Sequence, residues 1–198
     1  DRSMLKGKTP LTICFLLAAV FSTDFSYAQM TRISVGYSAI SGDALPAWLA
    51  KDTGIFEKNG LDVQLVFFTG GTTAVMALVS ADTPIAQLAG AAVINSVMAG
   101  SDAALIAGGV TSLNYYLLGR PEIKSPEQLK GGSVAISRFG SSSDFIARYA
   151  LQKVGLTPGK DVTIVQIGST TARVDATLAG RVQATVVNPP ASIIAQKR

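Results

Sequence analysis

Glycine, serine and threonine gather in four short segments, and these residue types suit the binding of a small molecule. The segments are residues 38–43, 69–73, 89–91 and 139–143. Small residues leave backbone N–H groups accessible, and hydroxyls donate or accept hydrogen bonds, so such segments can surround a polar group. Each segment taken alone fits a turn or a helix cap equally well. Four of them in equivalent places favour one shared binding site.

The residue types that most often perform catalysis are missing. The chain has no histidine and one cysteine, Cys14, which excludes Ser-His-Asp triads and the usual zinc-binding sets. Asp43 and Asp144 are plain loop residues in the sequence, and no carboxylate pair stands out. Gly70 and Gly71 are not followed by Gly-Lys-Ser/Thr, and no strand carries Gly-x-Gly-x-x-Gly. We therefore expect a binding protein that uses neither a metal ion nor a cofactor.

Four further residues bear on the ligand, and each allows two interpretations. Asp144 follows the serines directly, and its carboxylate would repel an anion unless it points into solvent, so the charge of the ligand stays open. Arg173 could pair with a carboxylate or a sulfonate, although an exposed surface arginine is the favoured interpretation. Trp48 and Tyr37 could line an apolar pocket, with ordinary packing as the default.

The first 28 residues have the pattern of a secretory signal peptide. Lys6 and Lys8 precede the apolar run 11–21, and Ala28 ends a small-x-small cleavage pattern. The run is shorter than the roughly 20 apolar residues that a membrane span requires. We expect cleavage after Ala28 and a mature protein in the periplasm. That mature protein has no cysteine, because Cys14 lies in the leader.

The charge pattern gives no indication of a nucleic-acid partner. The formal net charge is +4, and the lysines and arginines are scattered along the chain. A nucleic-acid-binding surface would instead need basic residues clustered on one face. We expect an ordinary solvated surface.

Strand and helix patterns alternate after the leader. Strands are predicted at residues 32–37, 62–68, 83–88, 104–110, 115–118, 133–137, 161–167 and 183–187. Helices are predicted at residues 44–52, 72–80, 91–99, 126–129, 142–154 and 171–179. This order is typical of an α/β protein with parallel strands and helices on both sheet faces. Ligands of such sheets bind beyond the carboxyl ends of the strands, where the four polar segments fall.

Residues 45–66 carry the clearest local signal. A short helix stops at Gly54, a single turn covers residues 55–58, and apolar residues alternate from Leu61 onward as in a half-buried strand. Residues 119–132 contain two prolines and several charges, which is typical of a connection between two blocks. We expect a signal peptide at 1–28, a first α/β lobe at 29–115 and a second at 116–198.

Four segments are also similar in sequence to one protein family. They are Val35-Gly36-Tyr37, WLAKDTGIFEKNGLDV at 48–63, IKSPEQLKG at 123–131 and LAGRVQA at 178–184. In these segments the chain resembles the periplasmic solute-binding proteins of nitrate/sulfonate/taurine-type ABC transporters, which share a fold with thiamine-pyrimidine-precursor proteins. The resemblance extends from Ile33 to Pro190, and its second and third segments are the most specific.

The resemblance implies a two-lobed α/β fold of the type II periplasmic-binding-protein kind. A sulfonate, nitrate, carboxylate or pyrimidine-like solute would bind between the lobes of a monomer, and closure would present it to the membrane permease of an ABC importer. The residues near the ligand would be Ser38, Gly70, Gly71, Thr72, Ala89, Gly90, Gly140, Ser141, Ser142 and Asn188. Such proteins normally continue well past Arg198, so the resemblance also implies a C-terminally truncated chain with an incomplete second lobe.

Two other functions stay open. The chain could be an enzyme related to the thiamine-pyrimidine synthases that share this fold. That chemistry uses a histidine as reactant and a cysteine-rich motif, and the mature sequence has neither. A ligand-sensing module without transport would show the same sequence features as a transport protein, so neighbouring genes would have to distinguish the two.

Overall fold

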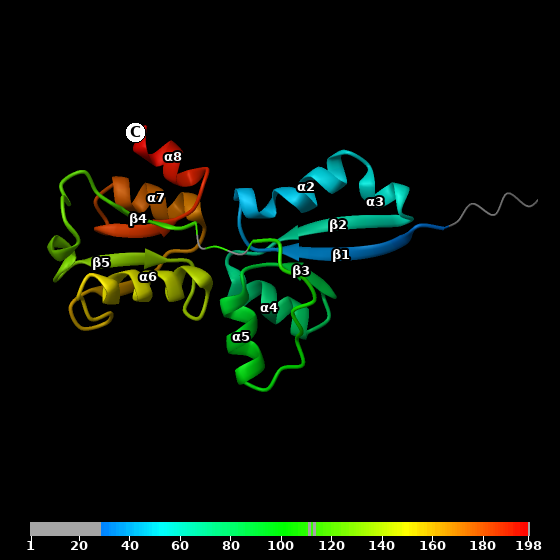
Figure 1. Ribbon diagram of the computed structural model, residues 1–198, viewed down its shortest axis with the longest axis horizontal. Helices are drawn as coiled ribbons and strands as arrows, with labels where there is room; N and C mark the ends of the chain where they lie inside the picture. Colours follow the sequence, from blue (N-terminus) through cyan, green and yellow to red (C-terminus); the bar gives the residue numbers. More distant parts are fainter. Residues whose placement is uncertain (1–28, 111, 113, 198) are drawn as a thin grey trace, which may run out of the picture.

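The computed structural model describes residues 29–110, 112 and 114–197. The predicted signal peptide and its cleavage site lie outside the described residues. Two separate sheets are present, with strand orders β2-β1-β3 and β4-β7-β5-β6. Each sheet carries its own helices, and the two units lie end to end along the long axis of the molecule (Figure 1). We call the three-stranded unit the first lobe and the four-stranded unit the second lobe; the division at residues 115 and 116 stays a prediction.

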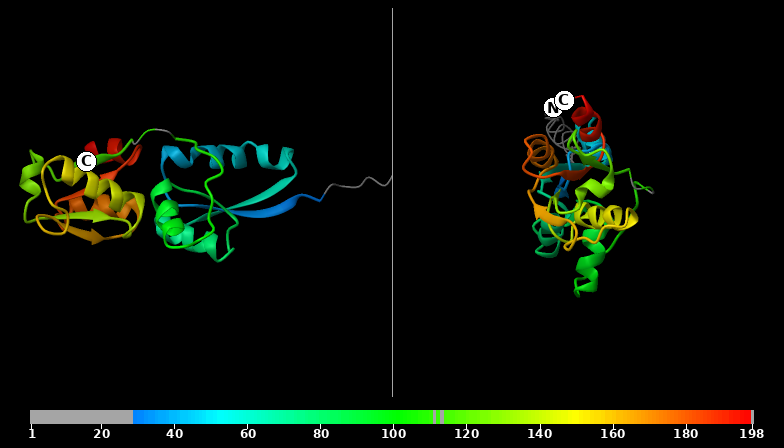
Figure 2. Two further views of the ribbon diagram at one scale, coloured as in Figure 1. Left: turned by 60° about the horizontal axis from the view of Figure 1, so that its bottom comes forward. Right: turned by 90° about the vertical axis from the view of Figure 1, so that its left-hand side faces the viewer.

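The first lobe is built on three parallel strands. β1 (Thr31–Tyr37) lies between β2 (Leu61–Phe67) and β3 (Ile85–Gln87). Its helices are η1 (Gly42–Ala44), α2 (Leu45–Asp52), α3 (Ile55–Lys58), α4 (Gly71–Val79) and α5 (Gly90–Met98). α2 and α3 cover one face of the sheet, and α4 and α5 lie on the other (Figures 1 and 2). The expected α/β layering is therefore present in this lobe.

The structure confirms the helix–turn–strand prediction for residues 45–66. Gly54 lies in the left-handed region, with φ +69°, and separates α2 from α3. Gly60 has φ +74° and leads directly into β2. Both positions favour glycine because a Cβ atom is strained in that conformation. The Asn59 side chain donates to the Ile55 carbonyl at 2.8 Å and closes the turn between them.

The second lobe combines parallel and antiparallel strands. In chain order its elements are β4 (Tyr116–Gly119), η2 (Pro126–Leu129), β5 (Ser133–Ile136), α6 (Ser142–Lys153), β6 (Thr163–Gln166), α7 (Thr170–Leu178), β7 (Ala184–Val187) and α8 (Ala191–Gln196). β5 pairs parallel with β6 and β7, whereas β4 pairs antiparallel with β7. The prediction of parallel strands throughout is wrong for β4. β4 follows the segment between α5 and β4, which we call the connecting segment, without a crossover helix, so it runs against its neighbour. Residues 119–132, which were predicted to connect the two blocks, instead lie within the second lobe, where Ile123 and Leu129 join its core.

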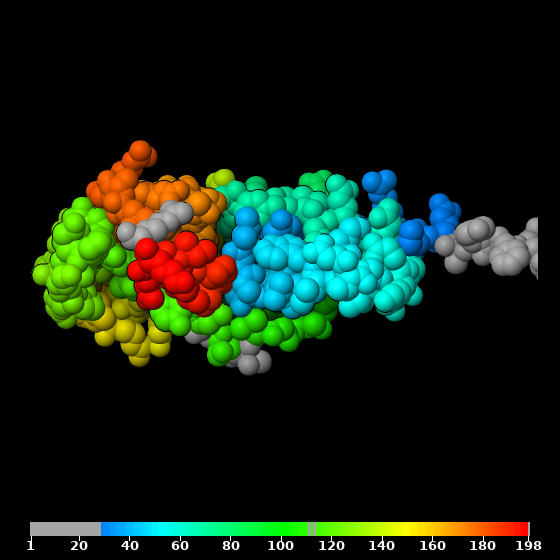
Figure 3. Space-filling model, turned by 90° about the horizontal axis from the view of Figure 1, so that it is seen from above, coloured from blue at the N-terminus to red at the C-terminus, as the bar shows by residue number. Residues whose placement is uncertain are grey.

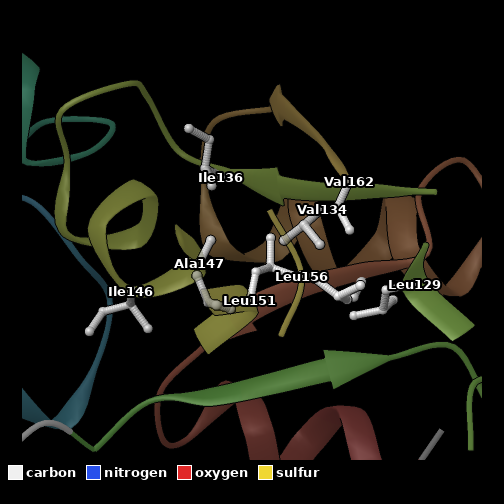
Figure 4. Packing of buried hydrophobic residues seen from close by; sticks show 10 residues of the cluster. Leu129, Val134, Ile136, Ile146, Ala147, Leu151, Leu156 and Val162 are labelled. Carbon is white, nitrogen blue, oxygen red and sulfur yellow. The ribbon is translucent and has the colours of Figure 1, made fainter. Parts of the chain in front are cut away.

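The better-defined hydrophobic core lies in the second lobe. Leu129, Val134, Ile136 and Leu151 are at most 1% exposed and pack together (Figure 4). The corresponding cluster in the first lobe has only three buried residues, Val75, Ala92 and Val93, each 4–5% exposed. Because burial of apolar area is the main stabilising term in folding, the second lobe has the stronger core.

The strand predicted at residues 104–110 is absent. This segment has no regular structure, and Leu105 and Ile106 are 62% and 83% exposed. Its apolar run satisfies the strand pattern, but a strand also requires a hydrogen-bonded neighbour. Among the described residues, β3 is the last strand on that side of the sheet and has no further partner. α8, conversely, was not predicted.

None of the described helices is long and apolar enough to cross a bilayer.

Leu151 on α6 provides a test of the core. Leu151→Ala should lower the free energy of unfolding by about 2–5 kcal/mol, because it leaves a cavity in a close-packed region. Urea unfolding followed by circular dichroism measures this change. Leu105→Ala is the matched control, since that side chain is 62% exposed and its loss should shift stability by no more than about 0.5 kcal/mol. Equal effects of the two substitutions would contradict the assignment of the core.

Candidate functional site

The carboxyl ends of strands from both lobes face each other across one junction. The arrowheads of β1 and β2 point toward the second lobe, and that of β5 points toward the first (Figure 1). β3 runs parallel with β1, and β6 and β7 run parallel with β5, so all six strands end at this junction. The loops that follow them therefore meet there. A ligand-binding site in an open α/β sheet is expected at this edge.

On the α4 side of the junction the lobes touch directly. The Thr72 hydroxyl donates to the Phe139 carbonyl at 3.0 Å, and the Asn95 amide donates to the Gly140 carbonyl at 3.1 Å. Gly70 lies so close to the other lobe that a Cβ atom there would be 2.8 Å from Ser137 Oγ. Of the predicted site residues, Gly70, Thr72 and Gly140 are thus brought together. Asn95 and Ser137 were missed, because neither stands in a recognisable motif.

On the other side of the junction Asp43 joins three parts of the chain. Its carboxylate accepts from the Asn188 amide at 3.1 Å and from the Asn114 amide at 3.3 Å. Its backbone carbonyl accepts from the Gln87 amide at 2.6 Å. The backbone N–H of the adjacent Gly42 donates to the Pro189 carbonyl at 3.2 Å. α8 accordingly lies beside α2 across the junction (Figure 3).

The predicted site residue Asn188 therefore contacts protein in this structure, through Asp43. The sequence alone gives Asp43 the features of a plain loop residue. It instead links the first lobe to the connecting segment and to the second lobe.

The serine-rich start of α6 is closely hydrogen-bonded. Ser137, Ser141 and Ser143 form a triangle of hydroxyls with separations of 2.8–2.9 Å. Asp144 is buried, contrary to the possibility that it points into solvent. Its carboxylate accepts from Gly140 N–H at 2.9 Å and pairs with Arg148 Nε at 2.7 Å. Its charge is therefore offset by a cation one helical turn away, which weakens its repulsion of an anionic ligand.

Arg173 is buried, so the favoured interpretation as an exposed surface arginine is wrong. Its guanidinium donates to four neutral oxygens, which are Thr185 Oγ1, Gly168 O, Thr170 Oγ1 and Val186 O. Burial lowers the pKa of Arg173 to about 10, with nearby Tyr115 acting in the opposite direction. That value is far above neutral pH, so the side chain stays a cation. Burial and then Asp43 raise the pKa of Tyr115, while Arg173 lowers it.

The remaining predicted residues occupy helix starts and loops at the junction. Gly71, Gly90 and Ser142 are the first residues of α4, α5 and α6, and Ala89 is the N-cap of α5. N–H groups in the first turn of a helix have no partner within the helix. Ser38 follows β1 directly and is partly buried.

Tyr37 and Trp48 pack against each other and do not line a pocket in the manner that the alternative interpretation required. Their ring centroids are 5.6 Å apart in an edge-to-face arrangement, and Phe67 packs 5.4 Å from Tyr37. Packing, the default interpretation, therefore describes them. Within the described part of the chain no group of three or more histidine, cysteine or acidic residues could hold a metal ion.

Comparison with known proteins identifies the family. The model of the NMT1/THI5-like family matches residues 42–190. The chain belongs to the NMT1/THI5-like family. A protein of Brucella abortus (strain 2308) that is named as a binding protein is 26% identical over 155 residues, which are 78% of this chain and 47% of that protein. The chain thus spans about half the length of this relative.

Solved structures show the same fold. The periplasmic aliphatic sulphonate binding protein SsuA of Escherichia coli superposes with a TM-score of 0.63 at 24% identity, covering 84% of this chain and 54% of that one. The periplasmic nitrate-binding protein NrtA of Synechocystis PCC 6803 gives a TM-score of 0.66 at 22% identity, covering 82% and 48%. The expected two-lobed type II periplasmic-binding-protein fold is confirmed.

Arg173→Lys tests whether the guanidinium holds the junction loops of the second lobe. Lysine keeps the charge but cannot reach four separate acceptors from one planar group. The variant should lose about 2 kcal/mol or more of unfolding free energy, measured by urea titration. Arg181→Lys is the control, because Arg181 is exposed and should change stability by no more than about 0.5 kcal/mol. A neutral Arg173→Lys substitution would show that the hydrogen bonds contribute little.

Proposed function

We propose that this chain is the solute-binding component of an ABC importer and that a small solute binds between its two lobes. The observation that carries the proposal is the junction itself, where six strands from two sheets end opposite each other. Membership of the NMT1/THI5-like family supports it, as does the name of the Brucella relative. The site is taken to be formed by the loops after β1, β2, β3 and β5.

Within this junction the proposed ligand-facing groups are the small residues at helix starts. Gly71, Gly90 and Ser142 would offer first-turn N–H groups, and Ser38 would offer a hydroxyl. The Ser38 side chain has no hydrogen bond to the described residues, so it is available to a solute. Gly70, Thr72, Ala89, Gly140, Ser141 and Asn188 are the other residues in the proposed site.

A small polar anion is the solute class that these charges favour. Helix N-termini attract negative charge, and buried Arg173 adds a cation whose described acceptors are neutral. Asp144, the carboxylate closest to the α6 terminus, is paired with Arg148. Sulfonates, nitrate and small carboxylates fit this description, and the structural neighbours include proteins named for sulphonate and nitrate. Pyrimidine-like solutes belong in the same screen.

The proposal includes a cellular setting. The leader pattern of residues 1–28 supports export to the periplasm, where the protein would act as a monomer. Its macromolecular partner would be the permease of the importer. Binding, not turnover of the solute, is the proposed activity, and the naming of the relative as a binding protein agrees with this.

Thermal unfolding with a solute panel tests the proposal. The panel contains an alkanesulfonate, nitrate, a small carboxylate and a pyrimidine. A solute present at about 100 times its Kd should add about 2.7 kcal/mol of stability, which raises the Tm by roughly 5–10 °C for a protein of this size. No shift with any member of the panel would count against solute binding.

A blocking variant localises the effect. Ser38→Phe places a large ring at the carboxyl end of β1, so it should abolish the solute-dependent rise in Tm without removing the fold. Thr163→Phe is the control, since Thr163 is exposed at the amino end of β6, away from the junction. If both variants responded to solute like the parent, the solute would bind outside the junction.

A further inference from the structure

The loop between β5 and α6 has most of its polar groups already occupied by protein. Phe139 N–H donates to the Gln166 side chain at 2.7 Å, and Gly140 N–H donates to Asp144 at 2.9 Å. The carbonyls of the same two residues accept from the first lobe, through Thr72 and Asn95. A ligand that approached Phe139 or Gly140 would have to replace bonds that the protein itself makes.

Ser137 is held rigidly behind this loop. Its hydroxyl lies 2.9 Å from Ser141 Oγ and 2.8 Å from Ser143 Oγ, and its N–H donates to Ser143 Oγ at 2.8 Å. All three serines are buried. Because the rotamer of Ser137 is fixed by these bonds, its side chain cannot swing away from an approaching group.

Gly70 in the first lobe is the group that approaches it. A Cβ atom on Gly70 would lie 2.8 Å from Ser137 Oγ and 3.2 Å from Ser137 Cβ. Gly70 also has φ +87°, a conformation that other residues rarely adopt. The contact therefore requires glycine for two reasons, and the steric reason acts between the lobes.

We propose that Gly70, Thr72 and Asn95 form a closing latch with the loop 137–140, so that these residues set the closed position of the lobes instead of contacting the solute. Gly70 positions the lobes by allowing contact with Ser137, and the two donors hold that contact. This inference rests on the proposed function, which requires lobes that open and close. It reassigns Gly70, Thr72 and Gly140 within the proposed site, leaving solute contact to Ser38, Gly71, Gly90 and Ser142.

Inter-lobe distances measured without any solute test the latch. Spin labels are placed at Met76→Cys on α4 and Gln152→Cys on α6, both exposed positions, in a Cys14→Ser background of the full chain. Pulsed electron spin resonance then reports the populations of short and long distances. The parent should show mainly the short distance of the closed state.

Gly70→Ala should lower the closed-to-open ratio about tenfold or more, because it overpacks the contact with Ser137. Adding Ser137→Gly removes the opposing side chain and should restore most of the population with the short distance. Gly168→Ala is the matched control, since Gly168 has φ +105° at the same junction but its Cβ would meet Thr69 at an ordinary 3.5 Å. Gly70→Ala with an unchanged distance, or without recovery in the double variant, would overturn the proposal.

The two donors are tested in the same assay. Thr72→Val and Asn95→Ala should each lower the closed-to-open ratio about fivefold, the usual effect of losing one hydrogen bond. Thr73→Val is the control, because its hydroxyl donates to Thr69 within the first lobe. If Thr72→Val and Asn95→Ala kept the closed-to-open ratio of the parent, as Thr73→Val should, the two hydrogen bonds would not contribute to the latch.

The outcome is separable from that of the solute screen. Normal latch behaviour with no stabilising solute would leave the latch standing and reject solute binding. A solute-dependent rise in Tm, together with an unchanged inter-lobe distance in Gly70→Ala, would support solute binding and reject the latch. Circular dichroism of every variant confirms that the lobes themselves stay folded.

Discussion

The constraint on which the rest of the structure depends is that the parallel strands of two sheets end against each other. The carboxyl end of a parallel strand leaves a loop with unpaired backbone groups, followed by the positive end of a helix. When two such edges meet, those groups need partners from the opposite lobe or from a ligand, because buried polar groups without partners are destabilising. The hydrogen bonds of Thr72, Asn95 and Asn188 across the junction are the direct result.

Short-range hydrogen bonds prepare the second lobe for this contact. The serine triangle and the Asp144–Arg148 pair fix the start of α6. Arg173 similarly ties the loop before α7 to β7 through Gly168 and Val186. A buried cation without a described anionic acceptor is expensive in a nonpolar setting, but four oriented oxygens reduce that cost. These local networks hold the junction surface of the second lobe in place. An added Cβ atom at Gly70 would therefore meet a Ser137 side chain that cannot move aside.

What the sequence could predict depends on the range of the interaction. The elements of residues 45–66 were predicted well because Gly54 and Gly60 determine the turns beside them, and such turns depend only on residues close by in the sequence. Residues 104–110 were predicted wrongly because their strand pattern required a distant partner that the described sheet lacks. The Asp144–Arg148 pair has the i,i+4 spacing of a helical ion pair and could have been recognised. The bond from Asn95 to Gly140 spans 45 residues, and no spacing rule indicates it. Burial of Arg173 likewise depends on β7, which follows it in the chain.

The two sets of contacts across the junction also limit where a solute could lie. Gly42 and Asp43 meet Pro189 and Asn188 on the side of α2 and α8, whereas Gly70 and Thr72 meet Ser137 and Phe139 on the side of α4 and α6. Both sides are closed by protein atoms, so a solute bound as proposed would have to lie between them. Under the proposed function, Ser38 and the first turns of α4, α5 and α6 would contact it there. A solute held there would be surrounded by two protein contacts that form without it, and selectivity would then depend on whether it fits between them.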